Sequence, residues 1–156
     1  QDRAVGGGRI IGEGCHFIDL LRHLAGAPVA DLHAVCVGDA PGMGVRDDKA
    51  SITLSFADGS VGTILYLANG HRSFPKERLE VFSGGAIAQL DNFRRLNSFG
   101  WPGLKGQRLW QQDKGQVACV AAFVDAITAG RPSPIPPEEL FEVASTTFDV
   151  GERLHA

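Results

Sequence analysis

The first strong pattern of hydrophobic residues in the chain is helical. Between residues 14 and 25, leucines and a phenylalanine recur at spacings of three and four, which places on one helix face Phe17, Leu20, Leu21 and Leu24. Gly26 and Pro28 follow, and both residue types are common just beyond the end of a helix. The pattern therefore predicts an amphipathic helix over 14–25.

A different period governs the middle of the chain. Residues 49–56 alternate between polar and apolar side chains, which predicts a half-buried strand with one apolar face. The pairs Asp58-Gly59 and Gly84-Gly85 are typical of hairpin turns, and alternation continues in the segments around them. The sequence therefore predicts an antiparallel meander of strands over 31–37, 49–56, 60–68, 77–83, 86–90 and 93–99, with a loop over 40–44.

Helical spacing returns near the C-terminus. Apolar residues recur at this spacing over 117–129, and Gly130 is the expected residue just past the helix end. A proline-rich segment over 131–137 separates this helix from a last one, whose first turn holds two glutamates that favour its positive end. The predicted buried stripe of the last helix is Leu140, Val143, Ala144, Thr147 and Val150.

The order of the predicted elements indicates the fold class. A helix is followed by a run of strands and then by two helices, which favours an α+β fold over alternating βαβ units. We expect an open, mainly antiparallel (mixed) β-sheet with helices packed on one face, its other face free or used for oligomerisation. Trp101 and Trp110 flank an irregular segment over 101–113, and we expect them to pack in the core, unless they line a pocket or a partner surface.

Composition excludes several classes of protein. The formal net charge of −3 argues against nucleic-acid binding, and no apolar run approaches the roughly 18 residues of a membrane span. Three widely spaced cysteines without a C-x-x-C pair argue against a disulfide scaffold and a zinc site, and are typical of reduced thiols in a cytoplasmic protein. The chain begins without Met or a signal peptide, so we expect it to be a fragment whose start lies elsewhere.

Candidate chemistry concentrates at the start of the first predicted helix. His16, Asp19 and His23 are spaced to share one helix face. Three interpretations are open: an ordinary polar helix edge, a histidine oriented by a carboxylate for acid–base work, or a metal site. His71 ends a strand and could face a cleft or lie in a solvated loop. The glycines over 6–14 lack both the full G-x-G-x-x-G pattern and the strand that precedes a dinucleotide-binding turn, so the chain alone is not expected to bind NAD.

The residues from Gly6 to Gly26 read G-G-G-R-I-I-G-E-G-C-H-F-I-D-L-L-R-H-L-A-G. They resemble the start of the C-terminal domain of the Gfo/Idh/MocA oxidoreductase family, where a glycine-rich stretch precedes D-x-G-x-H-x-x-D and a leucine-rich helix. The hairpin F-x-D-G-S and the stretch P-S-P-I-P-x-E-E-L before the last helix extend this resemblance over nearly the whole chain. The sequence of this first segment is similar to that of a bacterial subgroup of proteins in which a zinc-alcohol-dehydrogenase-like half precedes the Gfo/Idh/MocA half.

The resemblance implies roles for individual residues. Members of the family have an N-terminal Rossmann domain that binds NAD(H) or NADP(H) and carries a catalytic lysine. His16 would lie beside the nicotinamide and the substrate carbinol as acid–base or orienting group, with Asp19 holding it. Gly12 stands where the family has an acidic residue, so Glu13 is the candidate substitute. Arg9 and His71 are the candidate substrate-binding residues.

We therefore expect residues 1–156 to be one C-terminal substrate and oligomerisation domain of a nicotinamide-dependent oxidoreductase, with its Rossmann domain absent. The expected reaction is hydride transfer on a sugar, polyol or nucleotide-sugar derivative. NAD or NADP would serve the full-length protein, and the fragment alone would be inactive, with no cofactor and no metal. A second copy of the chain would bind through the open sheet face; no nucleic acid or membrane is expected as a partner.

Two alternatives remain. One is a stand-alone binding or assembly module that uses its sheet face for protein contacts. The other is a metal-dependent hydrolase that uses His16, Asp19 and His23.

Overall fold

The computed structural model describes residues 7–38 and 48–155, and the chain divides into two compact units. The first unit comprises Gln1–Asn69 and Ile135–Ala156, and the second comprises residues 70–134. The α+β class and the antiparallel pairing of the strands are confirmed, but the strands belong to two sheets. The loop expected over 40–44 lies outside the described residues. That residues 1–156 act as a single domain stays a prediction.

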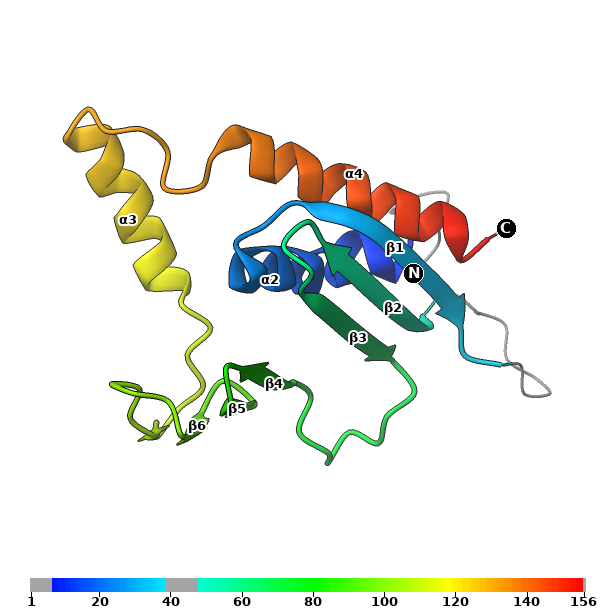
Figure 1. Cartoon of the computed structure of the whole chain (residues 1–156), viewed down its shortest axis with the longest axis horizontal. Helices are drawn as coiled ribbons and strands as arrows, with labels where there is room; N and C mark the ends of the chain where they lie inside the picture. The colour runs from blue at the N-terminus through cyan, green and yellow to red at the C-terminus, as the bar shows by residue number, and fades with distance from the viewer. Residues whose placement is uncertain (1–6, 39–47, 156) are drawn as a thin grey trace. The chain divides into compact units, whose positions relative to one another are not determined.

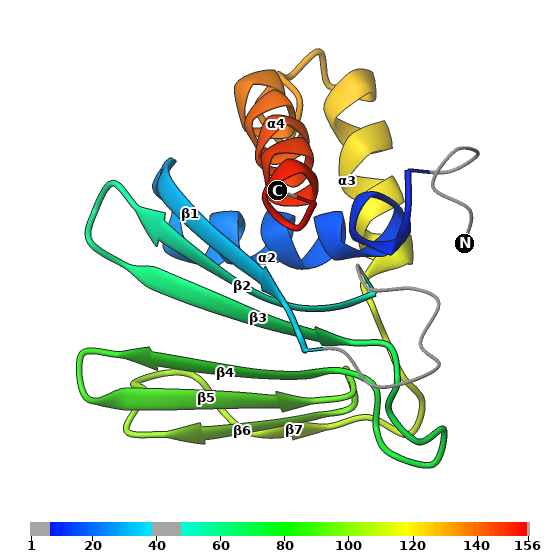
Figure 2. The same ribbon diagram turned by 90° about the vertical axis from the view of Figure 1, so that its right-hand side faces the viewer.

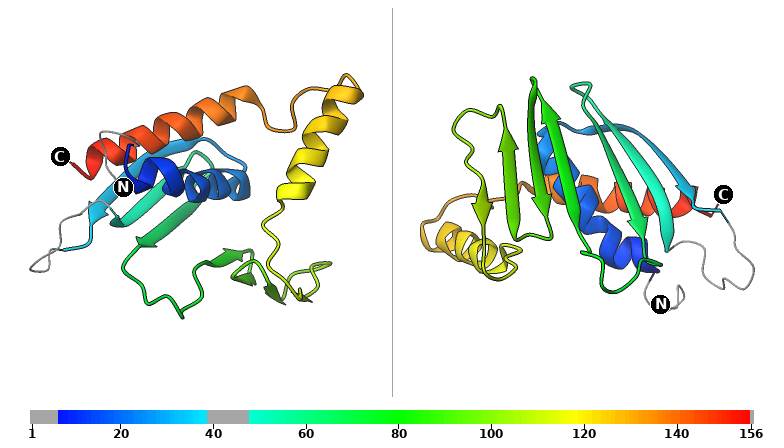
Figure 3. Two further views of the ribbon diagram at one scale, coloured as in Figure 1. Left: turned by 180° about the vertical axis from the view of Figure 1, so that it is seen from behind. Right: turned by 90° about the horizontal axis from the view of Figure 1, so that it is seen from below.

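The first unit is a three-stranded antiparallel sheet with two helices on one face (Figure 1, Figure 2). Its strands lie in the order β1-β2-β3, and Figure 3 shows both helices on the same side of them. A short π-helical turn, η1, runs directly into the first helix. The elements are η1 (Ile10–Gly14), α2 (Cys15–Ala25), β1 (Val29–Cys36), β2 (Lys49–Phe56), β3 (Val61–Leu67) and α4 (Pro137–Arg153).

The core of this unit lies between the sheet and the helices. The predicted alternation of β2 is confirmed, because its even-numbered residues are buried and its odd-numbered serines and Thr53 lie on the outer face. Helix α2 ends as predicted, with Gly26 in the left-handed conformation (φ 67°) as its C-cap. The largest fully buried side chains are Ile18, Ile52, Leu54 and Val150.

The predicted buried faces of α2 and α4 are only partly right. Leu24 is 45% exposed and Leu140 is 50% exposed, although both fit the apolar spacing. Ile18 and Arg22 are the buried residues of α2, whereas Phe17 and Leu21 of the predicted stripe are partly buried and pack against the core, so the buried face overlaps only part of the predicted stripe. The spacing of apolar residues shows which of them share a helix face, but it does not show that a buried polar contact such as that of Arg22 shifts the face that is buried.

A buried ion pair joins the two helices to the start of β1. Arg22 is 7% exposed, and its Nε donates to Oε2 of Glu142 at 2.9 Å. The other carboxylate oxygen of Glu142 accepts the backbone N–H of Val29 at 2.5 Å. One carboxylate of α4 thus satisfies a buried guanidinium on α2 and a backbone donor on β1. Glu139 adds a longer contact to Arg22 at 3.8 Å.

Gly62 in β3 lies close beneath the Leu21 side chain of α2. A Cβ atom at this position would lie 2.7 Å from Leu21 Cδ1 and 3.0 Å from Cδ2, which is too close for real atoms. We expect Gly62→Val to lower the free energy of unfolding by about 1–3 kcal/mol, because overpacking forces helix and strand apart. Urea unfolding of the chain measures this. Thr63→Val, on the outer face of the same strand, is the control, and an equal loss in both variants would contradict the role of close packing.

The second unit holds a four-stranded antiparallel sheet in the order β4-β5-β6-β7 (Figure 2). Gly84 and Gly85 form the predicted turn, both with positive φ. The next hairpin turn is unusual, because Asn92 and Phe93 both have φ 49°, and a phenylalanine rarely adopts this conformation. The elements are β4 (Arg78–Ser83), β5 (Ala86–Asp91), β6 (Arg95–Phe99), β7 (Gln107–Arg108) and α3 (Gln116–Thr128).

Two expectations for this unit need correction. The segment over 101–113 is not wholly irregular, since β7 pairs with β6. Trp110 is 90% exposed rather than packed in the core, because the backbone after β7 continues along the sheet edge, where Leu109 N–H bonds to Arg94 O. Trp101 is half-buried.

Helix α3 ends near Gly130 as predicted, but its apolar stripe is exposed and Ala126 is its buried residue within the described chain. No helix among the described residues is long and apolar enough to cross a membrane.

Candidate functional site

The start of α2 is where most of the predicted site residues meet. Arg9 immediately precedes η1, Glu13 lies in it, and His16 follows in the first turn of α2. A π-helical turn is rare and is frequently found at functional sites. Gly14 packs closely here, because a Cβ atom would approach Ile10 Cγ2 to 3.2 Å. The local geometry thus brings a guanidinium, a carboxylate and an imidazole to one end of the helix.

Tyr66 connects this helix start to the sheet. Its hydroxyl donates to Oε2 of Glu13 at 2.6 Å, and its ring meets the Phe17 ring edge-on with centroids 6.3 Å apart. Arg9 Nη1 lies 3.6 Å from Oε1 of the same carboxylate. The Arg9 and Glu13 side chains are 39% and 46% exposed, whereas Tyr66 as a residue is 9% exposed. The cluster of Arg9, Glu13 and Tyr66 therefore has a buried base and a polar, accessible rim.

Contacts within the cluster raise the pKa of two of its groups, the Tyr66 hydroxyl and the Arg9 guanidinium. Burial of the Tyr66 ring, and then the hydrogen bond to Glu13, raise the pKa of the Tyr66 hydroxyl above its ordinary value. The Tyr66 hydroxyl, followed by the Glu13 carboxylate, raises the pKa of the Arg9 guanidinium. At neutral pH the tyrosine is thus a hydrogen-bond donor and the arginine a cation.

His16, Asp19 and His23 line the outer edge of α2. Both histidines are exposed and Asp19 is half-buried. Over residues 7–38 and 48–155, no side-chain hydrogen bond joins Asp19 to His16, so the orienting role of Asp19 stays a prediction. The described residues contain no group of three histidine, cysteine or acidic side chains able to hold a metal ion.

His71 belongs to the second unit, in the loop between β3 and β4. Its side chain is exposed, and Nδ1 lies 2.8 Å from Ser73 Oγ in a local turn. The contact partner of His71 thus lies in the same loop. Its role in substrate binding stays a prediction.

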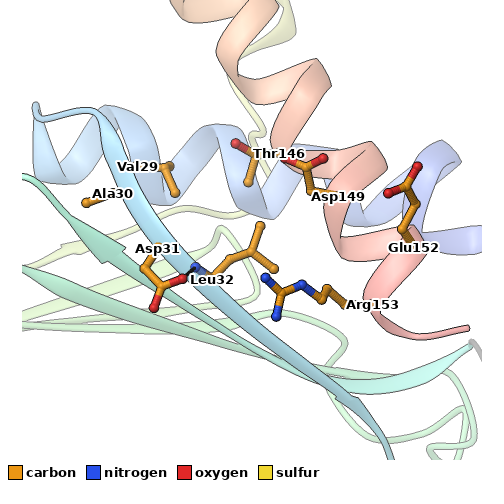
Figure 4. A pocket seen from close by; sticks show the side chains of 8 residues that line it. All are labelled: Val29, Ala30, Asp31, Leu32, Thr146, Asp149, Glu152 and Arg153. Atoms are coloured by element: carbon orange, nitrogen blue, oxygen red, sulfur yellow. Dashed lines mark hydrogen bonds between the residues drawn. The ribbon is translucent and has the colours of Figure 1, made fainter. Parts of the chain in front are cut away.

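A pocket of about 530 Å³ lies between β1 and the second half of α4 (Figure 4). Its charged side chains are Asp31, Asp149, Glu152 and Arg153, and buried Thr146 also lines it. None of the predicted site residues contributes to it. Asp31 already accepts the N–H of Leu32 at 2.8 Å. The pocket is therefore separate from the residues at the start of α2.

Tyr66 is the site residue that sequence reasoning missed. The chain contains a single tyrosine, and strand alternation places it on the inner face, two residues after Ile64. A buried tyrosine hydroxyl usually finds a hydrogen-bond partner, so its position on an apolar face was the available signal. The partner itself, 53 positions earlier in the sequence, could not be identified without the fold.

The glycine-rich stretch does not fit a dinucleotide. A Cβ atom at Gly12 would meet nothing within 4 Å, so this glycine holds no cradle open. The space beside Gly14 is filled by the Ile10 side chain. Phe17 stands at the position of the third glycine of a phosphate-binding turn. That the chain alone binds no nicotinamide cofactor stays a prediction.

Solved structures with the same fold are known. The chain is similar to UDP-N-acetylglucosamine 3-dehydrogenase from Acidithiobacillus ferrooxidans, with a TM-score of 0.73 and 20% identity over 99% of this chain and 49% of the other. It is also similar to aldose-aldose oxidoreductase from Caulobacter crescentus, with a TM-score of 0.71 and 18% identity over 99% of this chain and 48% of the other. A third similar structure is an oxidoreductase from Agrobacterium radiobacter in complex with NAD+, L-tartaric acid and magnesium. Its TM-score is 0.62, and the identity is 20% over 92% of this chain and 44% of the other. The chain thus spans about half the length of these proteins.

A comparison with curated proteins gave no match. The family model described as the GFO/IDH/MocA C-terminal domain, however, matches residues 1–88, which is more than half of the 156 residues and includes α2 and all three strands of the first sheet, β1, β2 and β3. The chain therefore belongs to the GFO/IDH/MocA C-terminal domain family.

Proposed function

We propose that the chain is the substrate and oligomerisation half of an NAD- or NADP-dependent oxidoreductase that acts on a sugar, polyol or nucleotide-sugar derivative. The observation that carries this proposal is the family match over the segment that bears Arg9, Glu13 and His16. Two similar structures are named as enzymes of a nucleotide sugar and of aldoses, which supports a sugar-like substrate. The other half of the protein would be a Rossmann domain upstream, and an additional zinc-alcohol-dehydrogenase-like half would place the protein in the bacterial subgroup.

The exposed edge of α2 would face the substrate. His16 is the residue we assign to proton transfer, because an exposed imidazole can accept a proton from a substrate hydroxyl and return it near neutral pH. Asp19 would orient it, and Glu13 would replace the acid that Gly12 cannot supply. Arg9 and His71 would bind substrate oxygens. The nicotinamide, held elsewhere in the whole protein, supplies hydride acceptance, and NAD+ in the Agrobacterium radiobacter structure is consistent with it.

Turnover by the complete protein tests this function. We expect the product of the full reading frame to reduce NAD or NADP when supplied with UDP-N-acetylglucosamine, glucose or myo-inositol, and the 156-residue chain to reduce neither. Reduction by the chain alone would show that it contains its own cofactor site. A reading frame that begins just before Gln1 and encodes no Rossmann domain would favour the stand-alone binding module instead.

The outer face of β1-β2-β3 is the surface we propose for self-association. It combines a central row of serines and Thr53 with flanking apolar side chains that are between 43% and 68% exposed: Val35, Val37, Val61, Leu65 and Leu67. An exposed apolar patch of this kind is typical of an interface. A C2 dimer would bury the same patch of both copies.

A charge at the centre of that face should disrupt the oligomer. We expect Leu65→Asp to weaken self-association at least about tenfold, because it buries an unpaired carboxylate in each copy. Sedimentation of the complete protein over a concentration series measures the change. Phe141→Asp, at a 76% exposed position on α4, is the matched control. If Leu65→Asp sediments like the unmodified protein while Phe141→Asp dissociates, the interface lies on the helices.

A further inference from the structure

We propose that Tyr66 is a positioning residue that fixes the Glu13 carboxylate, with Arg9, at the substrate side of α2. The proposal rests on the proposed function and extends it, since the family resemblance assigns no role to Tyr66. In this arrangement the fixed Glu13 takes the place of the acidic side chain that is missing at Gly12.

The contacts of Glu13 come from two directions. Tyr66 reaches its Oε2 from β3 at 2.6 Å, and Arg9 lies 3.6 Å from its Oε1 from within the same helical segment. The hydrogen bond from Tyr66 restricts the rotation of the carboxylate, and the ion pair with Arg9 adds to this, although almost half of the Glu13 side chain is open to solvent. It can therefore accept a hydrogen bond from a substrate hydroxyl without first being ordered.

The tyrosine hydroxyl is not needed for packing. Tyr66 lies on the inner face of β3, where its cross-strand neighbour is Ala50 and the ring contacts Phe17. A phenylalanine would fill the same space and avoid the cost of burying a hydroxyl. The hydroxyl donates to Glu13 and also interacts with Arg9, so we assign its role to what it does to those two accessible side chains.

Glu13 is close in sequence to His16. The two residues are three positions apart at the junction of η1 and α2, so one short helical segment carries both side chains. Fixing the carboxylate on the segment that carries the proton-transfer residue reduces the number of substrate poses that are unproductive. Tyr66 thus acts on the reaction through Glu13 and does not itself touch the reacting atoms.

Tyrosinate absorbance of the 156-residue chain tests the geometry without any substrate. Tyr66 is the single tyrosine, so the titration reports on it alone. Because Glu13 raises the pKa of the hydroxyl and Arg9 lowers it, Glu13→Gln should move the titration to lower pH and Arg9→Ala to higher pH. Shifts of opposite sign support the cluster. If neither variant moves the titration, the three side chains do not interact and the proposal fails.

Kinetics of the complete protein test the role. We expect Tyr66→Phe to lower kcat about tenfold and to change KM less than about twofold, with the melting temperature nearly unchanged since the ring stays in place. Glu13→Gln should have a similar effect, and the double variant should be no slower than Glu13→Gln alone. Ser83→Ala, which removes an exposed hydroxyl in the second unit, is the matched control.

The outcomes separate two failures. Normal turnover by Tyr66→Phe with a lowered melting temperature would reduce Tyr66 to a structural residue and leave the proposed function standing. Absence of NAD(P)-dependent turnover in the unmodified complete protein would overturn the proposed function and the positioning role together.

Discussion

Replacing His16 with asparagine is expected to lower kcat of the complete protein about 1,000-fold, within the range that general acid–base catalysis contributes. Asparagine keeps the size and one hydrogen-bonding nitrogen but cannot take up a proton near neutral pH. Because His16 is exposed at the start of α2, the variant should fold normally. The measurement is NAD(P)H formation under saturating substrate, with circular dichroism to verify the fold.

His23→Asn is the matched comparison for this prediction. His23 is exposed near the other end of the same helix, and the described residues place no metal-binding group around it. We expect His23→Asn to retain activity. Equal losses in both variants would favour a shared metal site over a single proton-transfer residue, and full activity of His16→Asn would remove His16 from the reaction.

The largest effect on stability is expected from Glu142→Ala. This change leaves the Arg22 guanidinium buried, with the Glu139 carboxylate at 3.8 Å as its remaining ion-pair partner among the described residues, and it removes the acceptor of Val29 N–H. Breaking a buried ion pair from one side costs several kcal/mol, and the 24% exposure of Glu142 reduces this to about 2–3 kcal/mol. The melting temperature of the chain should fall by roughly 5–10 °C.

Two further variants decide why the chain is destabilised. Glu138→Ala removes an exposed carboxylate from the first turn of the same helix and should have a much smaller effect. The double variant Arg22→Leu with Glu142→Leu should recover part of the loss, because an apolar pair leaves no buried charge unsatisfied. If Glu142→Ala melts like Glu138→Ala, the ion pair contributes nothing to the fold.

Much of the local structure follows from the sequence. The strict alternation over 49–56 and the turn pair Asp58-Gly59 give β2 and its hairpin almost residue by residue, because both patterns have few competing conformations. The end of α2 at Gly26 is equally well determined. Contacts between residues far apart in the sequence cannot be predicted in this way. The division of the strands into two sheets and the buried face of each helix therefore became known only from the structure.

The candidate site shows the same limit. His16 and Asp19 can be identified from the sequence because they lie three positions apart on one helix and both match the family motif. Tyr66 does not stand out, since its role depends on a contact between β3 and η1. Arg22 was similarly hidden: a charged residue within an apolar stripe gives no sign that Glu142, 120 positions later, will accompany it into the core.

Nicotinamide binding is the measurement that tests the central claim most directly, because it needs no knowledge of the substrate. NADH and NADPH fluorescence should respond to the complete protein and not to the 156-residue chain, and His16→Asn should bind the cofactor like the unmodified protein. The claim that this chain is the substrate half of a nicotinamide-dependent oxidoreductase would be contradicted if the complete protein bound neither nucleotide, or if the chain bound one by itself.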